Sequence, residues 1–101
     1  MNKPDIEIDI DGCKVSIRTN NIPGYGSWRC GYVTFPETDD LPGSCGPSAP
    51  VNGGLTYIEG RTLGWDYNHF YNMHSDTAMP DNETVISEAK ELIAWVRRKE
   101  V

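Results

Sequence analysis

The chain has 101 residues, of which 38% are hydrophobic and 24% are charged, and its formal net charge is −6 at pH 7. A chain of this length supports one hydrophobic core, so we expect a single domain over 1–101. Its apolar runs fall short of the ~20 residues that a membrane span needs, so we expect no membrane partner. Its excess of acidic residues disfavours direct contact with nucleic acid, so we expect no nucleic-acid partner.

The first predicted element is a β-hairpin. Apolar and acidic residues alternate from Ile6 to Ile10, and apolar residues return at every second position from Cys13 to Ile17. The dipeptide Asp11-Gly12 between them suits the positive φ angles of a two-residue type I′ turn. We expect the three isoleucines of the first strand to face the core and its acidic residues to face solvent.

The middle of the chain predicts one strand between two irregular segments. Thr19 to Ser27 contains a proline and two glycines and is predicted as a polar connection. Trp28 to Phe35 is rich in aromatic and β-branched residues and is predicted as the third strand. The segment 36–50 holds four prolines, which is typical of a mobile surface loop or of a loop that takes part in binding.

A second hairpin and a helix complete the predicted fold. Leu55–Ile58 and Leu63–Tyr67 flank Glu59-Gly60-Arg61 and are predicted as paired strands. Asp81 or Asn82 can cap a C-terminal helix. Its apolar residues recur at helical spacing and are Val85, Ile86, Ala89, Leu92, Ile93 and Val96. The sequence therefore predicts an α+β fold with an antiparallel sheet of four or five strands packed against one C-terminal helix.

The cysteines bear on metal binding and on location. The chain has three of them, Cys13, Cys30 and Cys45, and no C-x-x-C motif, which argues against a disulfide framework and against a zinc ribbon. The N-terminal residues lack the apolar stretch of a secretory signal peptide. We expect three free thiols, no metal, no cofactor and a cytoplasmic location.

The segment from Val51 to His69 has the richest chemistry. A glycine pair allows close approach of a ligand and can expose backbone N–H groups to an anion, while Asp66 and His69 are suited to proton or anion chemistry. We expect the glycine pair, the strand end at Asp66 and the loop 36–50 to meet. The predicted ligand-binding residues are Asn52, Gly53, Gly54, Tyr57, Trp65, Asp66 and His69.

Three interpretations of the same region stay open. Asp66, His69, His74 and Asp76 offer metal-ligand atoms, but their spacing matches no compact metal motif. Asp66 orienting His69 would suit general acid-base catalysis. A capped strand end with ordinary loop histidines explains the same residues without a site, and we assign no catalytic residue.

Gly31-Tyr32-Val33 is followed by Pro36, then by Val-Asn-Gly-Gly-Leu-Thr-Tyr at 51–57 and by Gly-Trp-Asp-x-x-His at 64–69. This order resembles a family of small uncharacterised proteins frequent in phages, prophages and bacteria, over roughly Cys30 to Val96. The family pattern usually has histidine where this chain has Asn52 and cysteine where it has Tyr67. If those residues form a catalytic or metal set in relatives, part of it is missing here, which favours binding over catalysis.

The resemblance implies a phage-type accessory protein that acts stoichiometrically in the cytoplasm of a host cell. It would bind a host protein, such as a defence protein, or sequester a small anionic, nucleotide-like signalling molecule. A small enzyme that uses Asp66 and His69, and a minor virion or assembly component, are the alternatives. Self-association into a homo-oligomer is a further option.

Overall fold

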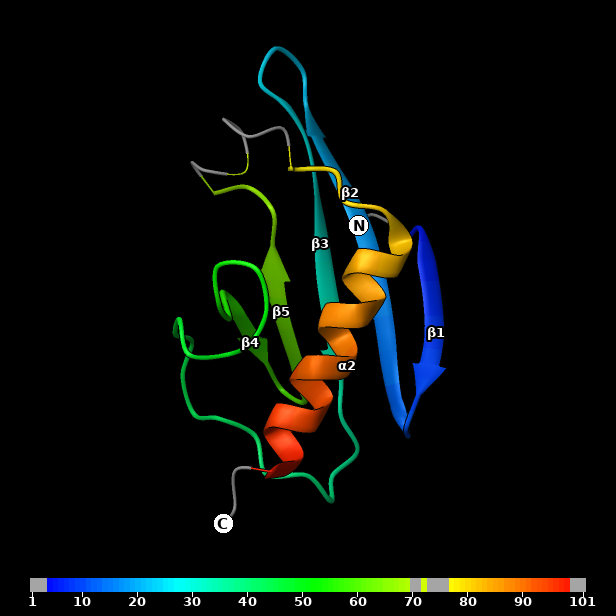
Figure 1. Ribbon diagram of the computed structural model, residues 1–101, viewed down its shortest axis with the longest axis vertical. Coiled ribbons are helices and arrows are strands. Elements are labelled where there is room, and N and C mark those ends of the chain that lie inside the picture. The colour runs from blue at the N-terminus through cyan, green and yellow to red at the C-terminus, as the bar shows by residue number, and fades with distance from the viewer. Residues whose placement is uncertain (1–3, 70–71, 73–76, 99–101) are drawn as a thin grey trace.

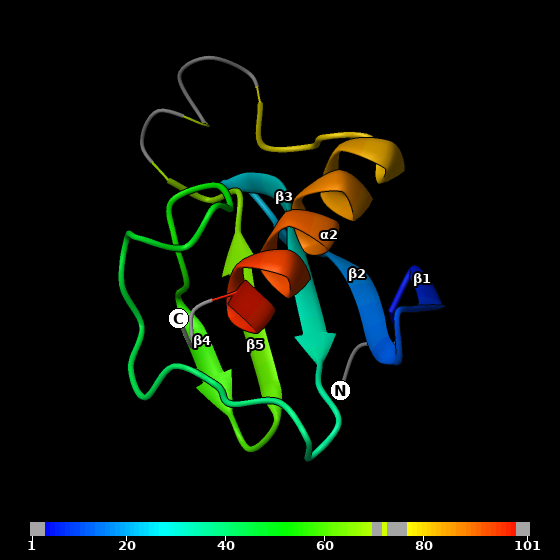
Figure 2. The ribbon, with the colours of Figure 1, turned by 60° about the horizontal axis from the view of Figure 1, so that its bottom comes forward.

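The computed structural model describes residues 4–69, 72 and 77–98. Within them the chain forms, in order, β1 (Ile6–Ile10), β2 (Cys13–Ile22), β3 (Gly26–Thr34), β4 (Tyr57–Glu59), β5 (Thr62–Asp66) and α2 (Asn82–Arg98). The strands make one antiparallel sheet in the order β1-β2-β3-β5-β4, and α2 lies across one of its faces (Figures 1 and 2). The predicted α+β architecture is confirmed.

The first hairpin has the predicted register. Ile10 pairs with Cys13, and the two turn residues Asp11 and Gly12 have φ angles of 51° and 84°. Positive φ at both central positions is the requirement of a type I′ turn. The isoleucines of β1 are half-buried against the core, whereas Cys13, Val15 and Ile17 on β2 are fully buried.

The predicted polar connection from Thr19 to Ser27 is wrong over most of its length. β2 continues to Ile22 and β3 begins at Gly26, so only three residues form the turn. The resulting hairpin extends beyond α2 (Figure 1). Because this end of the hairpin is not covered by the helix, its strands need no alternating apolar residues, and the sequence lacks the signal that marks a half-buried strand.

The second hairpin is shorter than predicted. Its first strand starts at Tyr57 and not at Leu55, since Leu55 instead makes an isolated bridge with Gly46. The Leu55 side chain is nevertheless buried. An apolar residue here indicates a loop that packs on the core, which period-2 patterning cannot distinguish from a strand.

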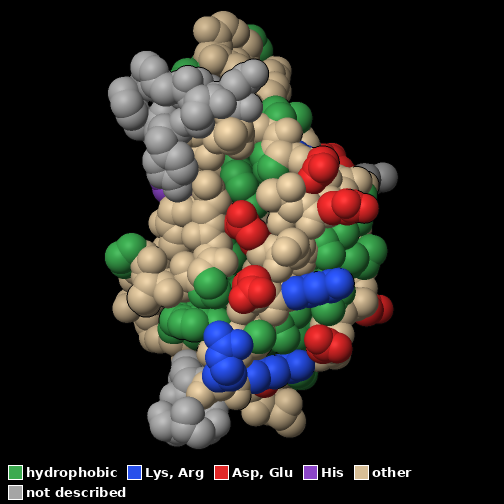
Figure 3. All heavy atoms as spheres, viewed as in Figure 1, with side chains coloured by type: hydrophobic (Ala, Val, Ile, Leu, Met, Phe, Trp, Pro, Cys, Tyr) green, Lys and Arg blue, Asp and Glu red, His purple; other side chains and the backbone are tan. Residues whose placement is uncertain are grey.

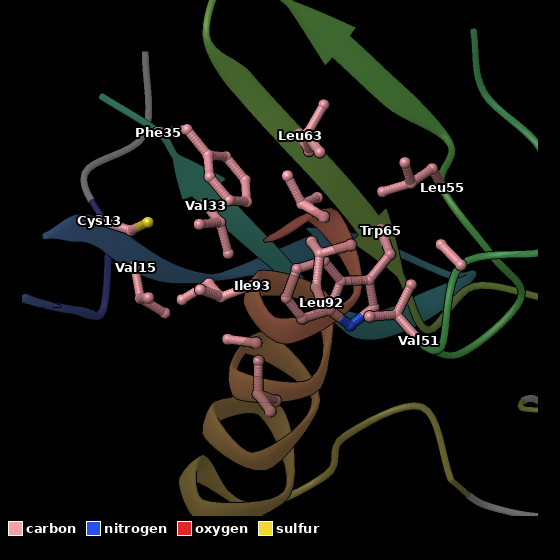
Figure 4. Close-up of a cluster of buried hydrophobic side chains, with 14 of the residues drawn as sticks. Cys13, Val15, Val33, Phe35, Val51, Leu55, Leu63, Trp65, Leu92 and Ile93 are labelled. Carbon is pink, nitrogen blue, oxygen red and sulfur yellow. The ribbon is translucent and has the colours of Figure 1, made fainter. Parts of the chain in front are cut away.

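One core lies between α2 and the sheet. The helix buries its apolar stripe chiefly against β2 and β3. Figure 4 shows Leu92 and Ile93 close to side chains from the strands, among them Val15 and Trp65. The predicted cap is also present, because Asp81 Oδ1 accepts a hydrogen bond from the Thr84 backbone N–H at 2.9 Å.

The loop 36–50 is anchored to the rest of the fold. Ala49, together with Val51 beyond the loop, is buried in the core. Arg97 near the end of α2 donates two hydrogen bonds of 3.0 Å to the Asp39 carboxylate. Arg61 donates to the backbone carbonyls of Pro36 and Asp39. The loop therefore has a fixed path around one end of the sheet, unlike the mobile surface loop that its composition suggests.

The outer side of α2 is polar. Figure 3 shows basic and acidic side chains scattered over the face that carries the helix, with hydrophobic side chains between them. Neither α2 nor any other helix in the described ranges has the length and hydropathy needed to cross a membrane.

We predict that Leu92→Ala lowers the free energy of unfolding by roughly 2 to 5 kcal/mol, because it removes a fully buried side chain from the interface between helix and sheet. The neighbouring exposed residue provides the control, since Glu91→Ala should change it by less than about 0.5 kcal/mol. Chemical denaturation of the two variants measures both values. Equal midpoints would contradict the packing.

Candidate functional site

The face of the sheet that α2 does not cover has a hollow of about 310 Å³ near its centre. We call it the aromatic hollow. It lies over β3, β5 and the start of β4, where the pairs Cys30–Asp66 and Tyr32–Gly64 lie side by side. The residues that line it are Trp28, Cys30, Tyr32, Thr56, Tyr57, Trp65, Asp66 and Asn68.

The hollow results from a large-small-large pattern along β3. Trp28, Cys30 and Tyr32 occupy alternate positions of the strand and share one face. The two rings are therefore rooted about 13 Å apart, with only a cysteine side chain between them. On β5, Gly64 leaves room for Tyr32, since a Cβ at that position would lie 2.7 Å from Tyr32 Cδ1.

Two edge-to-face ring pairs involve residues that line the hollow. Tyr25 contacts Trp28 with ring centroids 5.7 Å apart, and Tyr32 contacts Tyr57 at 5.3 Å. Such T-shaped pairs stabilise the position of both rings. The Tyr25 hydroxyl also donates to Asn68 Oδ1 at 2.8 Å. The tip of the β2–β3 hairpin is thereby tied to the residues that follow β5.

Asp66 supplies the carboxylate of the hollow and is held by its neighbours. Its Oδ1 accepts a hydrogen bond from the Asn68 backbone N–H at 3.0 Å, and its Oδ2 accepts one from the Thr56 hydroxyl at 2.8 Å. Oδ1 also lies 3.5 Å from His69 Nε2. The same carboxylate therefore lies next to His69 and accepts the backbone hydrogen bond of a capped strand end, so the geometry contains both arrangements that the sequence left open.

The glycine pair meets His69 and the loop 36–50, where the sequence places the site. Gly53 has a φ of 73° and lies against the His69 ring, so a Cβ there would be 2.7 Å from two ring carbons. Gly54, with a φ of 78°, packs against Pro47 in the same close manner. Side chains with a Cβ do not fit at either position.

The expected exposure of backbone N–H groups at the glycine pair is wrong for Gly54, and the N–H of the preceding Asn52 is also engaged. The Gly54 N–H donates to the Val51 carbonyl at 2.9 Å, and the Asn52 N–H donates to Glu88 Oε1 at 2.8 Å. Both donors are satisfied within the fold. An anion that approached these two donors would have to displace their present acceptors, whereas the close contacts of Gly53 and Gly54 with His69 and Pro47 give the glycine pair a role in packing.

The Asn52 side chain connects two segments of the fold by hydrogen bonds. Its amide nitrogen donates to the Asp66 backbone carbonyl at 3.0 Å and to Asn72 Oδ1 at 2.9 Å. Asn72 is 1% exposed, and its own amide donates to Thr77 Oγ1 at 3.0 Å. Buried amides need such partners. Asn52 therefore joins the glycine turn to the end of β5 and contributes to the hollow only through Asp66.

Trp65 does not offer the stacking face that the sequence suggests. It is 1% exposed, its ring packs over Gly31 on the side of α2, and its indole N–H donates to the Tyr67 hydroxyl at 3.2 Å. Burial raises the pKa of that hydroxyl. Among the predicted ligand-binding residues, Tyr57 and Asp66 present their side chains to the hollow, whereas His69 lies beside Asp66 over Gly53.

Sequence reasoning missed most of the aromatic wall. Trp28 and Tyr32 lie in a segment that it predicted correctly as a strand, but only the strand as a whole was considered. Splitting that strand by its period of two would have placed both rings on one face with Cys30 between them. The hairpin contact of Tyr25 had no such signal, because it depends on the pairing of distant residues.

The lining residues other than Asp66 are neutral near pH 7. Burial raises the pKa of the Cys30 thiol and raises the pKa of Tyr32 to about 12. The hydrogen bond to Glu59 raises the pKa of Tyr57. Asp66 is thus the one formal charge among the described lining residues. Because thiolates and not thiols are nucleophiles, Cys30 is a poor candidate for covalent chemistry.

Within the described ranges, no three His, Cys, Asp or Glu side chains are placed to hold a metal ion. His74 and Asp76, which belong to the metal interpretation, lie outside those ranges. The chain matches no protein-family model, no curated protein and no solved structure. Its function is therefore inferred from the hollow and its surroundings.

We predict that Gly53→Ala destabilises the protein more than Gly60→Ala does. Both positions have positive φ, which costs a residue with a Cβ about 1 to 2 kcal/mol, but only Gly53 has a ring against it. A double variant, Gly53→Ala with His69→Ala, should recover the difference. Thermal unfolding of the set measures it, and equal losses at the two glycines would contradict the contact.

We predict one fast-reacting thiol with Ellman's reagent near neutral pH and three in denaturant, because only Cys45 is exposed. Burial raises the pKa of Cys13 and Cys30 above the usual 9.0, so the folded state holds these protons longer than the unfolded state. Stability should therefore fall as pH rises through and above 9. Fewer than three thiols in denaturant without reductant would contradict free cysteines.

Proposed function

We propose that the protein acts stoichiometrically, by binding a protein partner through the aromatic hollow and the adjoining tip of the β2–β3 hairpin. The observation that carries this proposal is the set of exposed aromatic rings on the uncovered sheet face. Tyr25 is 54% exposed and Tyr57 is 39% exposed. Tyrosine and tryptophan are enriched in protein interfaces and dominate their binding energy.

The hairpin tip extends the same surface. Ile22 is 50% exposed beside Tyr25. The ten residues from Thr19 to Trp28 carry no charge, in a chain of which 24% is charged. An uncharged projecting hairpin that ends in apolar side chains suits insertion into a cleft of another protein, because few charges would have to be desolvated.

The biological setting of this proposal comes from the sequence resemblance. The motifs around Gly31, Gly53 and Asp66 suggest a phage-type accessory protein. In that setting the partner is a host protein, such as a defence protein, and the complex forms in the host cytoplasm. The structural support for this setting is the binding surface formed by the hollow and the hairpin tip.

A small nucleotide-like ligand is the second candidate, and the volume of the hollow favours it. About 310 Å³ lies at the lower end of the range for small-molecule sites, and Trp28 or Tyr57 would give a base a stacking face. Two features support the protein partner instead. The charge of the lining is negative, and the backbone donors of Asn52 and Gly54, which would meet a phosphate, are already used.

The enzyme alternative would use the Asp66–His69 couple. Both oxygens of Asp66 accept hydrogen bonds from Thr56 and from the backbone, which suits a carboxylate with a fixed orientation. Turnover of a captured ligand remains the measurement that separates the two functions.

We predict that a photo-crosslinking amino acid, p-benzoylphenylalanine, captures a partner when it replaces Tyr57 but not when it replaces Lys90. Tyr57 lies in the hollow and Lys90 is exposed on α2. The experiment irradiates bacterial cells that express each variant and identifies the adduct by mass spectrometry. The expected product is one specific adduct of one copy of each protein.

The identified partner is then purified and mixed with the unmodified protein. A complex of 1:1 stoichiometry, weakened by Tyr25→Ser, is the expected result, since that ring is exposed at the hairpin tip and contacts Trp28, which lines the hollow. Equal adducts from both crosslinking positions, or conversion of a ligand over many turnovers, would contradict stoichiometric binding through this face.

A further inference from the structure

The carboxylate in the aromatic hollow is fixed in place but not saturated. Asp66 Oδ1 and Oδ2 accept hydrogen bonds from the Asn68 N–H and the Thr56 hydroxyl. His69 Nε2 also lies 3.5 Å from Oδ1. A carboxylate has about four lone-pair sites, and Oδ2 accepts only the Thr56 hydrogen bond among the contacts described, so Oδ2 retains capacity for a further donor. Because its orientation is already set, a ligand that donates to it loses little affinity to ordering the site.

The walls around this carboxylate are aromatic faces and edges. Trp28 and Tyr32 stand on either side of Cys30, and Tyr57 closes one end. The electron-rich faces of such rings attract cations. One such cation–π contact is present on the same sheet face, where the Arg18 guanidinium lies 5.5 Å from the centre of the Tyr32 ring.

The charge balance selects a cation over an anion. Asp66 is the single formal charge among the described lining residues, and the whole chain carries −6. Two basic side chains lie near the hollow without lining it: His69 Nε2 is 3.5 Å from Asp66 Oδ1, and the Arg18 guanidinium is 5.5 Å from the centre of the Tyr32 ring. An anionic group would meet a carboxylate without a basic residue of the lining to balance it, which is unfavourable in a partly desolvated site.

We propose that the aromatic hollow binds an arginine side chain of the partner. Its guanidinium donates hydrogen bonds to Asp66 and stacks on Trp28 or Tyr57. This proposal rests on the binding function proposed above and names the chemistry of its ligand. Arginine suits the site because its planar donors fit a carboxylate while its flat group stacks on aromatic rings.

The test titrates the protein with N-acetyl-arginine methylamide and follows the tryptophan indole N–H signals by NMR. The chain has three tryptophans, and the Trp65 indole, buried and bonded to Tyr67, is an internal reference. We expect the Trp28 signal to move and the Trp65 signal to stay. The norleucine analogue, similar in length but uncharged, should bind at least about tenfold more weakly because it cannot donate to the carboxylate.

Charge variants establish the sign of the preferred ligand. Asp66→Asn should weaken arginine binding about tenfold or more, since a hydrogen bond to a charged group is lost. Asp40→Asn removes the same charge from an exposed position in the loop 36–50 and should leave binding unchanged. Arg18→Gln should keep or tighten it. An anionic, nucleotide-like ligand would show the opposite order, with Arg18→Gln weakening AMP binding and Asp66→Asn strengthening it.

A second measurement keeps the test valid if Asp66→Asn loses its fold. Raising the ionic strength from about 0.01 M to about 0.15 M shortens the Debye length from about 30 Å to about 8 Å, so arginine binding to the unmodified protein should weaken. The uncharged analogue should show no such change. Binding of both analogues with equal affinity, or stronger binding of AMP, would overturn the proposal.

Failure of this inference differs from failure of the proposed function. If the Tyr57 crosslink forms but neither the arginine probe nor Asp66→Asn affects the complex, the protein binds a partner without a basic side chain in the hollow. If the probe binds as expected but the crosslinks at positions 57 and 90 are equal, the hollow takes a cation but is not the partner surface.

Discussion

The structure depends on two reciprocal contacts between glycine and an aromatic ring in the centre of the sheet. In the pairing of β3 with β5, Gly31 lies opposite Trp65 and the next residue, Tyr32, lies opposite Gly64. Each ring covers the glycine across from it. Because side chains alternate between faces, Trp65 fills the core on the side of α2 and Tyr32 forms a wall of the hollow on the other side.

These contacts link the core to the candidate site. A Cβ at Gly31 would overlap the Trp65 ring, and a Cβ at Gly64 would lie 2.7 Å from Tyr32 Cδ1. A side chain at either glycine would therefore move a ring on one face and disturb the pairing that positions the other. The packing of α2 and the shape of the hollow are two consequences of one strand pairing.

The elements that could be predicted from the sequence are those whose signal is local. The type I′ turn needs only Asp11-Gly12, and the helix needs only its own apolar spacing and its cap at Asp81. The path of the loop 36–50 could not be predicted in the same way. It is fixed by Arg97, which lies 58 residues from its partner Asp39, and no pattern within the loop encodes that contact.

The predictions about the candidate site also succeed or fail according to whether their signal is local. The sequence predicts Asp66 as a site residue from its chemistry alone, and the predicted close approach at Gly53 and Gly54 is present in the structure. The role given to Trp65 was wrong, although its face was predicted correctly. Alternation placed it with Leu63 and Tyr67, and that face proved to be the buried one. A ring on the buried face stabilises the core and is not accessible to a ligand.

The departure at Asn52 from the motif of the resembling family has a structural counterpart. Its amide donates at once to the Asp66 carbonyl and to Asn72, and Asn72 Nδ2 also lies 3.3 Å from Asn52 Oδ1. A neutral histidine has one donor and could not satisfy both acceptors. In this chain the residue beside the glycine pair therefore fixes the backbone from which Asp66 extends. A carboxylate held from behind by Asn52 and from the side by Thr56 has a fixed orientation, so a group that donates to it would lose little affinity to ordering the site.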